Sequence, residues 1–108
     1  MTAPLVMRDL QRLERLYAAG FHDAFLDNAL RKAIEHQIAR DEADLKRVEE
    51  VVAQFERQYG LSTDEFGRQY EAGQVADTAD FMEWNTFRKM RQRLTARLQI
   101  LRGETAHG

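Results

Sequence analysis

The longest stretch of this sequence without glycine or proline runs from Phe21 to Tyr59, and it limits what the chain can form. Glycine and proline are the residues least compatible with a helix interior, so their absence predicts one continuous helix over residues 23–59. The side chain of Asp23 can cap its first turn. At 1.5 Å per residue such a helix is roughly 55 Å long, too long for a 108-residue globule to bury. We therefore expect it to fold back on a second helix of the same chain or to pack on another chain.

Apolar side chains recur along this helix in steps of three and four residues, which is the heptad pattern of a helix that packs along its length on another helix. A similar seam follows the helix expected over residues 78–102. Two charges, Asp41 and Arg91, occupy seam positions, and we predict that they approach each other across the hairpin or across a dimer. The seam residues are Ile34, Ile38, Asp41, Leu45, Val48, Val52, Phe55 and Tyr59 on the first helix and Arg91, Leu94, Leu98 and Leu101 on the second.

Two shorter helices complete the expected fold. One covers residues 5–19 and ends at Gly20. The other covers residues 63–72, after a capping box in which Ser62 accepts from the Glu65 amide and the Glu65 carboxylate returns to the Ser62 amide. Residues 103–108 are expected to form a frayed tail. The predicted fold is a single all-α domain over residues 1–108: a long antiparallel, coiled-coil-like helical hairpin, with a short N-terminal helix and a short helix at its tip.

Charge is unevenly distributed along the chain, although the formal net charge is only −2. The balance is +1 over residues 1–40, −8 over residues 41–83 and +5 over residues 84–108. The acidic part of the long helix would flank the basic fourth helix in a hairpin, so internal neutralisation explains this segregation. The alternative is that one of the charged segments faces a partner.

Five aromatic residues lie within 22 positions around the two expected turns. They can form a small core that closes the hairpin tip, or a patch that anchors a partner. Both hold if Trp84 lies half in the core and half presented. The candidate partner-binding set is Phe66, Tyr70, Phe81, Glu83, Trp84 and Phe87.

The residue types required for most catalytic and metal chemistry are missing or isolated. The chain has no cysteine, and its only serine, Ser62, is explained by helix capping. His36 has Lys32 and Arg40 at the helical spacings where metal ligands would be needed. We therefore expect no catalytic centre, no metal site and no cofactor.

A run of basic residues in the last helix could contact the phosphates of a nucleic acid. Its members spread around the helix instead of forming one stripe, and the sequence pI is 5.9, so we favour a solvated or ion-paired face over phosphate contacts. No apolar run approaches the roughly 18 residues that a membrane span needs, and early charges such as Arg8 and Asp9 argue against a signal peptide. The expected location is the cytoplasm. The basic residues are Arg88, Lys89, Arg91, Arg93, Arg97 and Arg102.

The segment from Phe55 to Trp84 resembles small prokaryotic proteins that are antitoxin-like components of toxin–antitoxin gene pairs. The resemblance covers about thirty residues, and the first and last helices lie outside the matching pattern. It implies a non-catalytic protein that binds and neutralises a small toxin, often one that attacks RNA. The matching residues are Phe55, Glu56, Tyr59, Gly60, Ser62, Glu65, Phe66, Tyr70, Glu71, Gly73, Asp77, Asp80, Phe81, Glu83 and Trp84.

The sequence therefore leads first to a helical interaction protein, antitoxin-like, that acts through helix packing and an acidic surface. Its expected partners are another protein, such as a toxin, a second copy of the chain, or both. The alternatives are a structural homo-oligomer that pairs its exposed seam, and a nucleic-acid-associated accessory protein that uses the basic helix.

Overall fold

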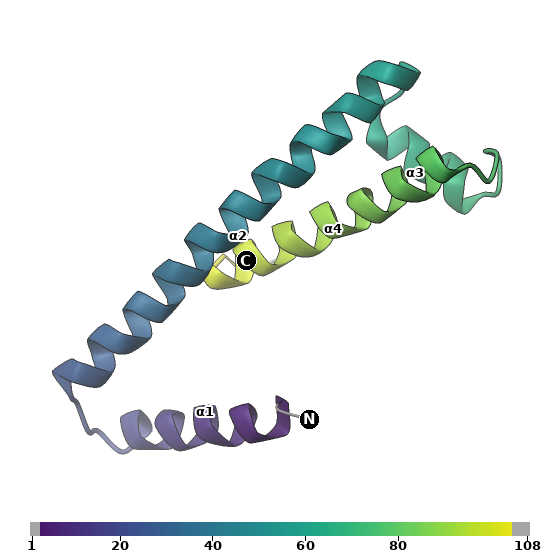
Figure 1. Ribbon diagram of the computed structural model, residues 1–108. Helices are drawn as coiled ribbons and strands as arrows, with labels where there is room; N and C mark the ends of the chain where they lie inside the picture. The colour runs from purple at the N-terminus through teal and green to yellow at the C-terminus, as the bar shows by residue number, and fades with distance from the viewer. Residues whose placement is uncertain (1–2, 105–108) are drawn as a thin grey trace. The chain divides into compact units, whose positions relative to one another are not determined.

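A computed structural model describes residues 3–104 as four α-helices joined by turns (Figure 1). They are α1 (Ala3–Ala18), α2 (Ala24–Tyr59), α3 (Thr63–Glu71) and α4 (Ala79–Leu101). Each begins and ends within two residues of the bounds expected from the sequence, and the all-α class is confirmed. Of the expected tail, residues 105–108 lie outside the described part of the chain.

The helix ends follow the expected capping chemistry with one exception. Asp23 accepts from the amides of Phe25 and Leu26 at 2.8 and 3.2 Å, and Ser62 accepts from the Glu65 amide at 3.1 Å. The expected return bond from Glu65 to the Ser62 amide is wrong, because the Glu65 carboxylate accepts from Arg68 and Gln69 instead. Those two side chains lie three and four residues further along α3, on the same helix face.

The chain divides into two compact units, residues 1–33 and 34–108, and the boundary falls inside α2. The second unit contains the predicted antiparallel hairpin, which is confirmed: α4 runs back beside the C-terminal part of α2, and α3 closes the tip (Figure 1). Gly60, with φ of +63°, allows the chain to leave α2 sharply and enter α3.

The core of this second unit lies at the hairpin tip. Phe55 from α2, Phe66 from α3 and Trp84 from α4 are buried together, and Val51 and Leu61 pack beside them. Their bulk, together with α3, keeps the two long helices apart at the tip, whereas α2 and α4 approach each other towards the end of α4 (Figure 1).

Burial along the predicted seam follows the length of the hairpin. Val48, Val52, Phe55 and Leu98 are buried, as is the charged Asp41. Ile34 remains 45% exposed, since α4 ends at Leu101 and offers no side chain at that level. The other seam residues are half-buried (Ile38, Leu45, Arg91, Leu94 and Leu101) or, like Tyr59, partly exposed.

The first unit is a small helical hairpin of α1 and the first turns of α2. The Tyr17 hydroxyl donates to the Asp27 carboxylate at 2.6 Å, and the Tyr17 ring meets His22 edge-on. Gly20, with φ of +92°, ends α1 as expected. From Leu5 to Ala33, no residue is buried.

Candidate interaction site

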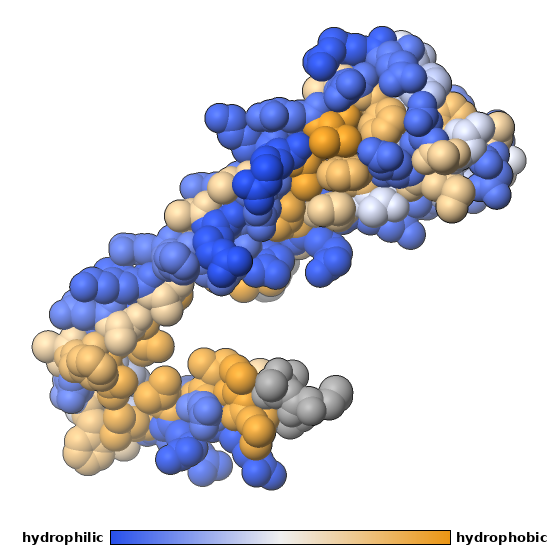
Figure 2. All heavy atoms as spheres, in the orientation of Figure 1, coloured by the Kyte–Doolittle hydropathy of each residue, from blue (hydrophilic) through white to orange (hydrophobic). Residues whose placement is uncertain are grey.

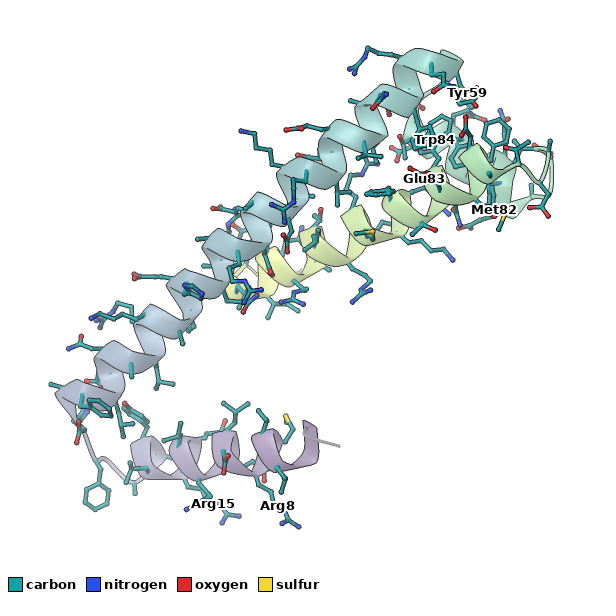
Figure 3. The ribbon with its side chains drawn as sticks, viewed as in Figure 1. Arg8, Arg15, Tyr59, Met82, Glu83 and Trp84 are labelled. Atoms are coloured by element: carbon teal, nitrogen blue, oxygen red, sulfur yellow. The ribbon has the colours of Figure 1, made fainter. Side chains whose placement is uncertain are left out.

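The tip cluster, formed by Phe55, Tyr59, Phe66, Phe81 and Trp84, is built around one indole ring. Trp84 stacks on Phe66 with ring centroids 3.9 Å apart and planes 4° from parallel. It also lies nearly parallel to Phe55, at 5.6 Å, and to Tyr59, at 5.8 Å. Rings from three helices therefore hold the tip together, and Figure 3 shows Tyr59 and Trp84 where α2 and α4 meet it.

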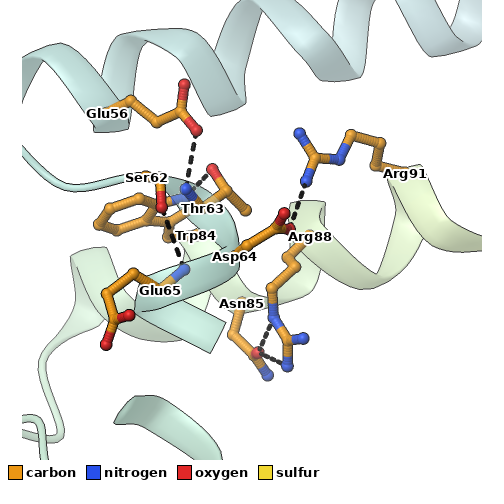
Figure 4. A network of polar contacts seen from close by, with 9 residues as sticks. All are labelled: Glu56, Ser62, Thr63, Asp64, Glu65, Trp84, Asn85, Arg88 and Arg91. Carbon is orange, nitrogen blue, oxygen red and sulfur yellow. Dashed lines mark hydrogen bonds and ion pairs between the residues drawn. The ribbon is translucent and has the colours of Figure 1, made fainter. Parts of the chain in front are cut away.

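A polar chain crosses the tip beside these rings (Figure 4). The Trp84 Nε1–H donates to the Thr63 hydroxyl at 3.1 Å, and the Thr63 amide donates to the Glu56 carboxylate at 2.7 Å. Thr63 is buried, so these bonds satisfy groups that would otherwise be costly to remove from water. The chain links α4 to α3 and α3 to α2.

Burial of Trp84 corrects one expectation. Trp84 and Phe66 are both 0% exposed, so the expectation that Trp84 is half presented to a partner is wrong. Its ring faces are covered by aromatic neighbours and its only polar atom is bonded to Thr63. Tyr70, Phe81 and Phe87 are half-buried and Glu83 is exposed, and their contact with a partner remains a prediction.

Arg88 is a buried cation that the sequence analysis did not single out for this role. Its guanidinium donates to the Asn85 side chain at 2.8 and 3.0 Å and to Glu71 at 2.7 Å. It lies directly over Gly67, where an added Cβ would come within 2.7–2.9 Å of its atoms. The glycine inside the short helix is therefore explained by close packing. The Arg88 bond also lowers the pKa of Glu71 below its usual value of 4.5.

The charged seam residues pair differently from the prediction. Asp41 is 2% exposed and accepts from Arg97 at 2.9 and 3.3 Å and from Gln37 at 2.9 Å. The expected approach of Asp41 to Arg91 is wrong within the chain. Arg91 lies six residues closer to the tip than Arg97, about 9 Å along the helix, and reaches Asp64 at 3.5 Å instead.

Internal pairing accounts for much of the charge segregation. Arg97 and Arg102 bridge α4 to Asp41 and Glu42 on α2. Arg88 and Arg91 bridge α4 to Glu71 and Asp64 on α3. Four of the six basic residues in the last segment are thus engaged by carboxylates of the acidic segment.

An apolar groove opens between α2 and α4, on the stretch between the tip cluster and the Asp41–Arg97 pair. Its volume is about 560 Å³, within the range of ligand pockets. Apolar side chains form its floor, and the arginines of both helices stand on its rim. The lining residues are Asp44, Arg47, Val48 and Val51 from α2 and Phe87, Met90, Arg93, Leu94 and Arg97 from α4.

Only part of this groove was identified from the sequence. Val48, Phe87 and Leu94 were in the predicted sets, whereas Val51 and Met90 were not. Met90 follows Phe87 by three residues and precedes Leu94 by four. It therefore supplies the apolar seam residue that the pattern lacks when the charged Arg91 is taken as the seam position. This spacing is the signal that could have placed Met90 on the α2-facing side of α4.

α1 carries the second apolar surface, which we call the α1 face. At 100° per residue, Val6, Leu10, Leu13 and Tyr17 share one side of the helix, and Asp9 and Glu14 flank that side at its two edges. Val6 and Leu10 are 51% and 50% exposed. Figure 2 shows apolar spheres along one side of α1 and hydrophilic spheres along the other, and Figure 3 shows Arg8 and Arg15 pointing from the same side of the helix.

Comparisons with known proteins add no relative: no family model, no curated protein and no solved structure matches this chain. Within residues 3–104, no group of three or more histidine, aspartate or glutamate side chains is arranged to hold a metal ion. In the same part of the chain, no helix is both long and apolar enough to cross a membrane. The exposed apolar side chains of the groove and of the α1 face make these two surfaces the candidate interaction sites.

Proposed function

We propose that this protein is a non-catalytic interaction module that binds another protein by helix packing. One observation carries the proposal: residues 5–33 hold many large apolar side chains and bury none of them. Leu5, Leu10, Phe21 and Phe25 are each half or more exposed, and Phe25 reaches 77%. Contiguous apolar surface of this kind marks interaction sites in folded proteins.

Physical limits on small units support the same conclusion. Units below about 40 residues seldom fold alone without disulfides, metals or association, and this chain has no cysteine. An isolated helix of 16 residues is marginally stable in water. Burial of the α1 face against another protein surface would supply the free energy that the first unit lacks.

The resemblance to antitoxin-like proteins suggests a small toxin as that partner. Much of the matching segment has a folding role here, since Phe66 and Trp84 form the core and Ser62 caps α3. Partner contacts would then lie outside these buried residues. Exposed carboxylates such as Glu49 and Glu50 on α2 supply the acidic surface that a basic toxin would approach.

Co-expression tests this proposal. The chain is induced together with the small protein encoded beside its gene, and growth and complex formation are measured. We expect restored growth and a co-purifying complex, both lost in Leu10→Glu, because a charge would enter an apolar contact. Gln11→Glu, on the other side of α1, is the matched control and should behave as the unaltered chain.

Two results would count against this function. A neighbouring product that is harmless when expressed alone would remove the toxin as the partner. Full protection by a folded Leu10→Glu protein would show that the α1 face is not the binding surface, whatever the partner is.

A further inference from the structure

We infer that the groove between α2 and α4 is the receptor for the α1 face of a second copy of this chain, so that two copies exchange their first helices. The inference rests on the proposed function, in which the α1 face is an interaction surface. It names a second copy as the partner of that face, so a toxin would bind the resulting dimer on the acidic side of α2. Seating an amphipathic helix in an apolar groove is a common mode of protein recognition. A reciprocal exchange also gives the closed two-fold symmetry that most homodimers have.

Size is the first argument. The groove extends over eight residues of α2, from Asp44 to Val51, and over eleven residues of α4, from Phe87 to Arg97. These stretches correspond to about 10 and 15 Å of helix. The part of the α1 face from Val6 to Leu13 spans about 10 Å. The two apolar surfaces therefore match in length.

Charge is the second argument. The rim of the groove carries Arg47, Arg93 and Arg97. Arg47 pairs with Asp44 and Arg97 with Asp41, so Arg93 supplies the positive charge that these two pairs do not offset. The α1 face is flanked by carboxylates on both edges, Asp9 and Glu14. A helix that inserts its apolar side into the groove would thus bring acidic edges to a basic rim. Such complementarity favours this partner and this orientation over like-charged ones.

The α1 arginines are compatible with this seating. Arg8, Arg12 and Arg15 lie on the side of the helix opposite the α1 face. They would remain in solvent when the apolar side is covered. The basic rim would therefore not meet a basic helix surface.

Covalent reach limits how far Leu10 extends along its own chain. The Tyr17–Asp27 bond holds the end of α1 at the first turn of α2. Leu10 lies seven residues before Tyr17, about 10 Å along α1. The groove begins at Asp44, seventeen residues beyond Asp27, about 26 Å along α2. While that bond holds and α2 stays helical, Leu10 falls short of the Asp44 end of its own groove, which favours a second copy as the partner.

The test is the mass of the purified full chain in solution, measured by light scattering across concentration at two salt levels. We expect a dimer of about twice 12.6 kDa that weakens at higher salt, because the rim charges are screened. Leu10→Glu on the α1 face and Met90→Glu in the groove should each raise the dimer dissociation constant by roughly 30-fold or more. Met90 is 37% exposed, so its substitution spares the tip cluster.

Two controls separate lost contact from lost fold. Ile100→Glu changes a residue of α4 that is 76% exposed and outside the groove, and Gln11→Glu changes the other side of α1. Both should dimerise as the unaltered chain does. Helix content and Trp84 fluorescence should be the same in all four variants.

Mixing the two defective chains gives the decisive result. A Leu10→Glu chain keeps an intact groove and a Met90→Glu chain keeps an intact α1 face, so the mixture should regain dimer that neither forms alone. Failure to regain dimer would overturn the exchange. In a dimer that pairs α1 with α1, or groove with groove, mixing the two variants would not increase the amount of dimer.

The remaining outcomes distinguish this inference from the proposed function. A dimer broken by Leu10→Glu but untouched by Met90→Glu would overturn the groove as receptor and leave the α1 face as an interaction surface. A monomer at every concentration would overturn the inference and leave the co-expression test to decide the function. A dimer that neither substitution weakens would overturn the inference as well.

Discussion

The hairpin tip and residues 3–33 are both amphipathic helical structures, and they use their apolar residues in opposite ways. At the tip, Phe66 and Trp84 have no exposed surface and three helices contribute to one core. In the first unit no residue from Leu5 to Ala33 is buried, although α1 has a well-defined apolar side. An apolar periodicity thus shows that a helix has a face to cover, and the number of helices that meet there decides whether the chain covers it.

The comparison predicts its largest effect at Trp84. Trp84→Ala should lower the free energy of unfolding by about 3–5 kcal/mol, because it empties the centre of the tip cluster. Leu10→Ala should change it by roughly 0.5 kcal/mol or less at concentrations where the chain is a monomer. Both are measured by denaturant unfolding followed by circular dichroism, since Trp84 is the only tryptophan. An equal loss for Leu10→Ala would mean that the first unit has a core of its own.

The second effect concerns the Asp41–Arg97 pair, remote from the aromatic tip. Arg97→Ala would leave the Asp41 carboxylate buried with Gln37 as its remaining donor in this group. Removing one partner of a fully buried pair costs about 3–5 kcal/mol, but the Arg97 side chain is half exposed, so we expect about 1–2 kcal/mol.

Arg93→Ala is the matched control for this pair. Arg93 is exposed on the same helix, so the change should be close to zero in the same unfolding measurement. Equal effects of the two substitutions would show that the pair adds nothing to the hairpin outside its tip.

The third prediction is that Gly67→Ala changes the folding stability in the direction opposite to the usual glycine-to-alanine effect in a helix. Alanine normally stabilises a helix interior by about 1 kcal/mol relative to glycine. Here its Cβ would come within 2.9 Å of Arg88 and displace its bonds to Asn85 and Glu71, so Gly67→Ala should destabilise the protein. In an Arg88→Ala background the same substitution should stabilise it. A stabilising Gly67→Ala in the unaltered chain would mean that Arg88 moves aside without loss.

These particular residues show how far a sequence can predict such a fold. Helix ends were predictable because Asp23, Ser62 and the glycines at positions 20 and 60 satisfy local backbone requirements. Antiparallel pairing followed from one long seam and a short connection. These features depend on residues close together in the chain.

Contacts that depend on helix register were not predictable in the same way. The heptad pattern placed Asp41 on the seam, but its partner is Arg97 and not Arg91, because periodicity gives the facing side and not the axial offset. The groove is lined by both α2 and α4, so the pattern of neither helix alone predicts it. Likewise, the requirement for glycine at position 67 depends on Arg88, which lies on another helix.

The smallest expected effect concerns the hydrogen bond between Tyr17 and Asp27, which joins α1 to α2 in the first unit. The hydrogen bond to Asp27, helped by partial removal from water and by the carboxylate charge, raises the pKa of Tyr17 from 10.0 to about 12. The neutral phenol is the donor, so this contact stabilises the α1–α2 hairpin below pH 10. The stabilisation is lost as the pH rises through about 12.

Titration of carbon-labelled tyrosine followed by NMR separates Tyr17 from the other two tyrosines. Asp27→Asn should bring the Tyr17 pKa back towards 10, because the charged acceptor is removed. Tyr59, whose pKa is raised by its bond to Asp80, serves as an internal reference from the tip and should not respond to that substitution. If Tyr17 titrates near 10 in the unaltered chain, the hydrogen bond that fixes the end of α1 to α2 is absent in solution. The limit on how far α1 reaches along its own chain would then be lost. The first unit would differ from the tip in lacking fixed contacts between its helices, and not only in lacking a buried core.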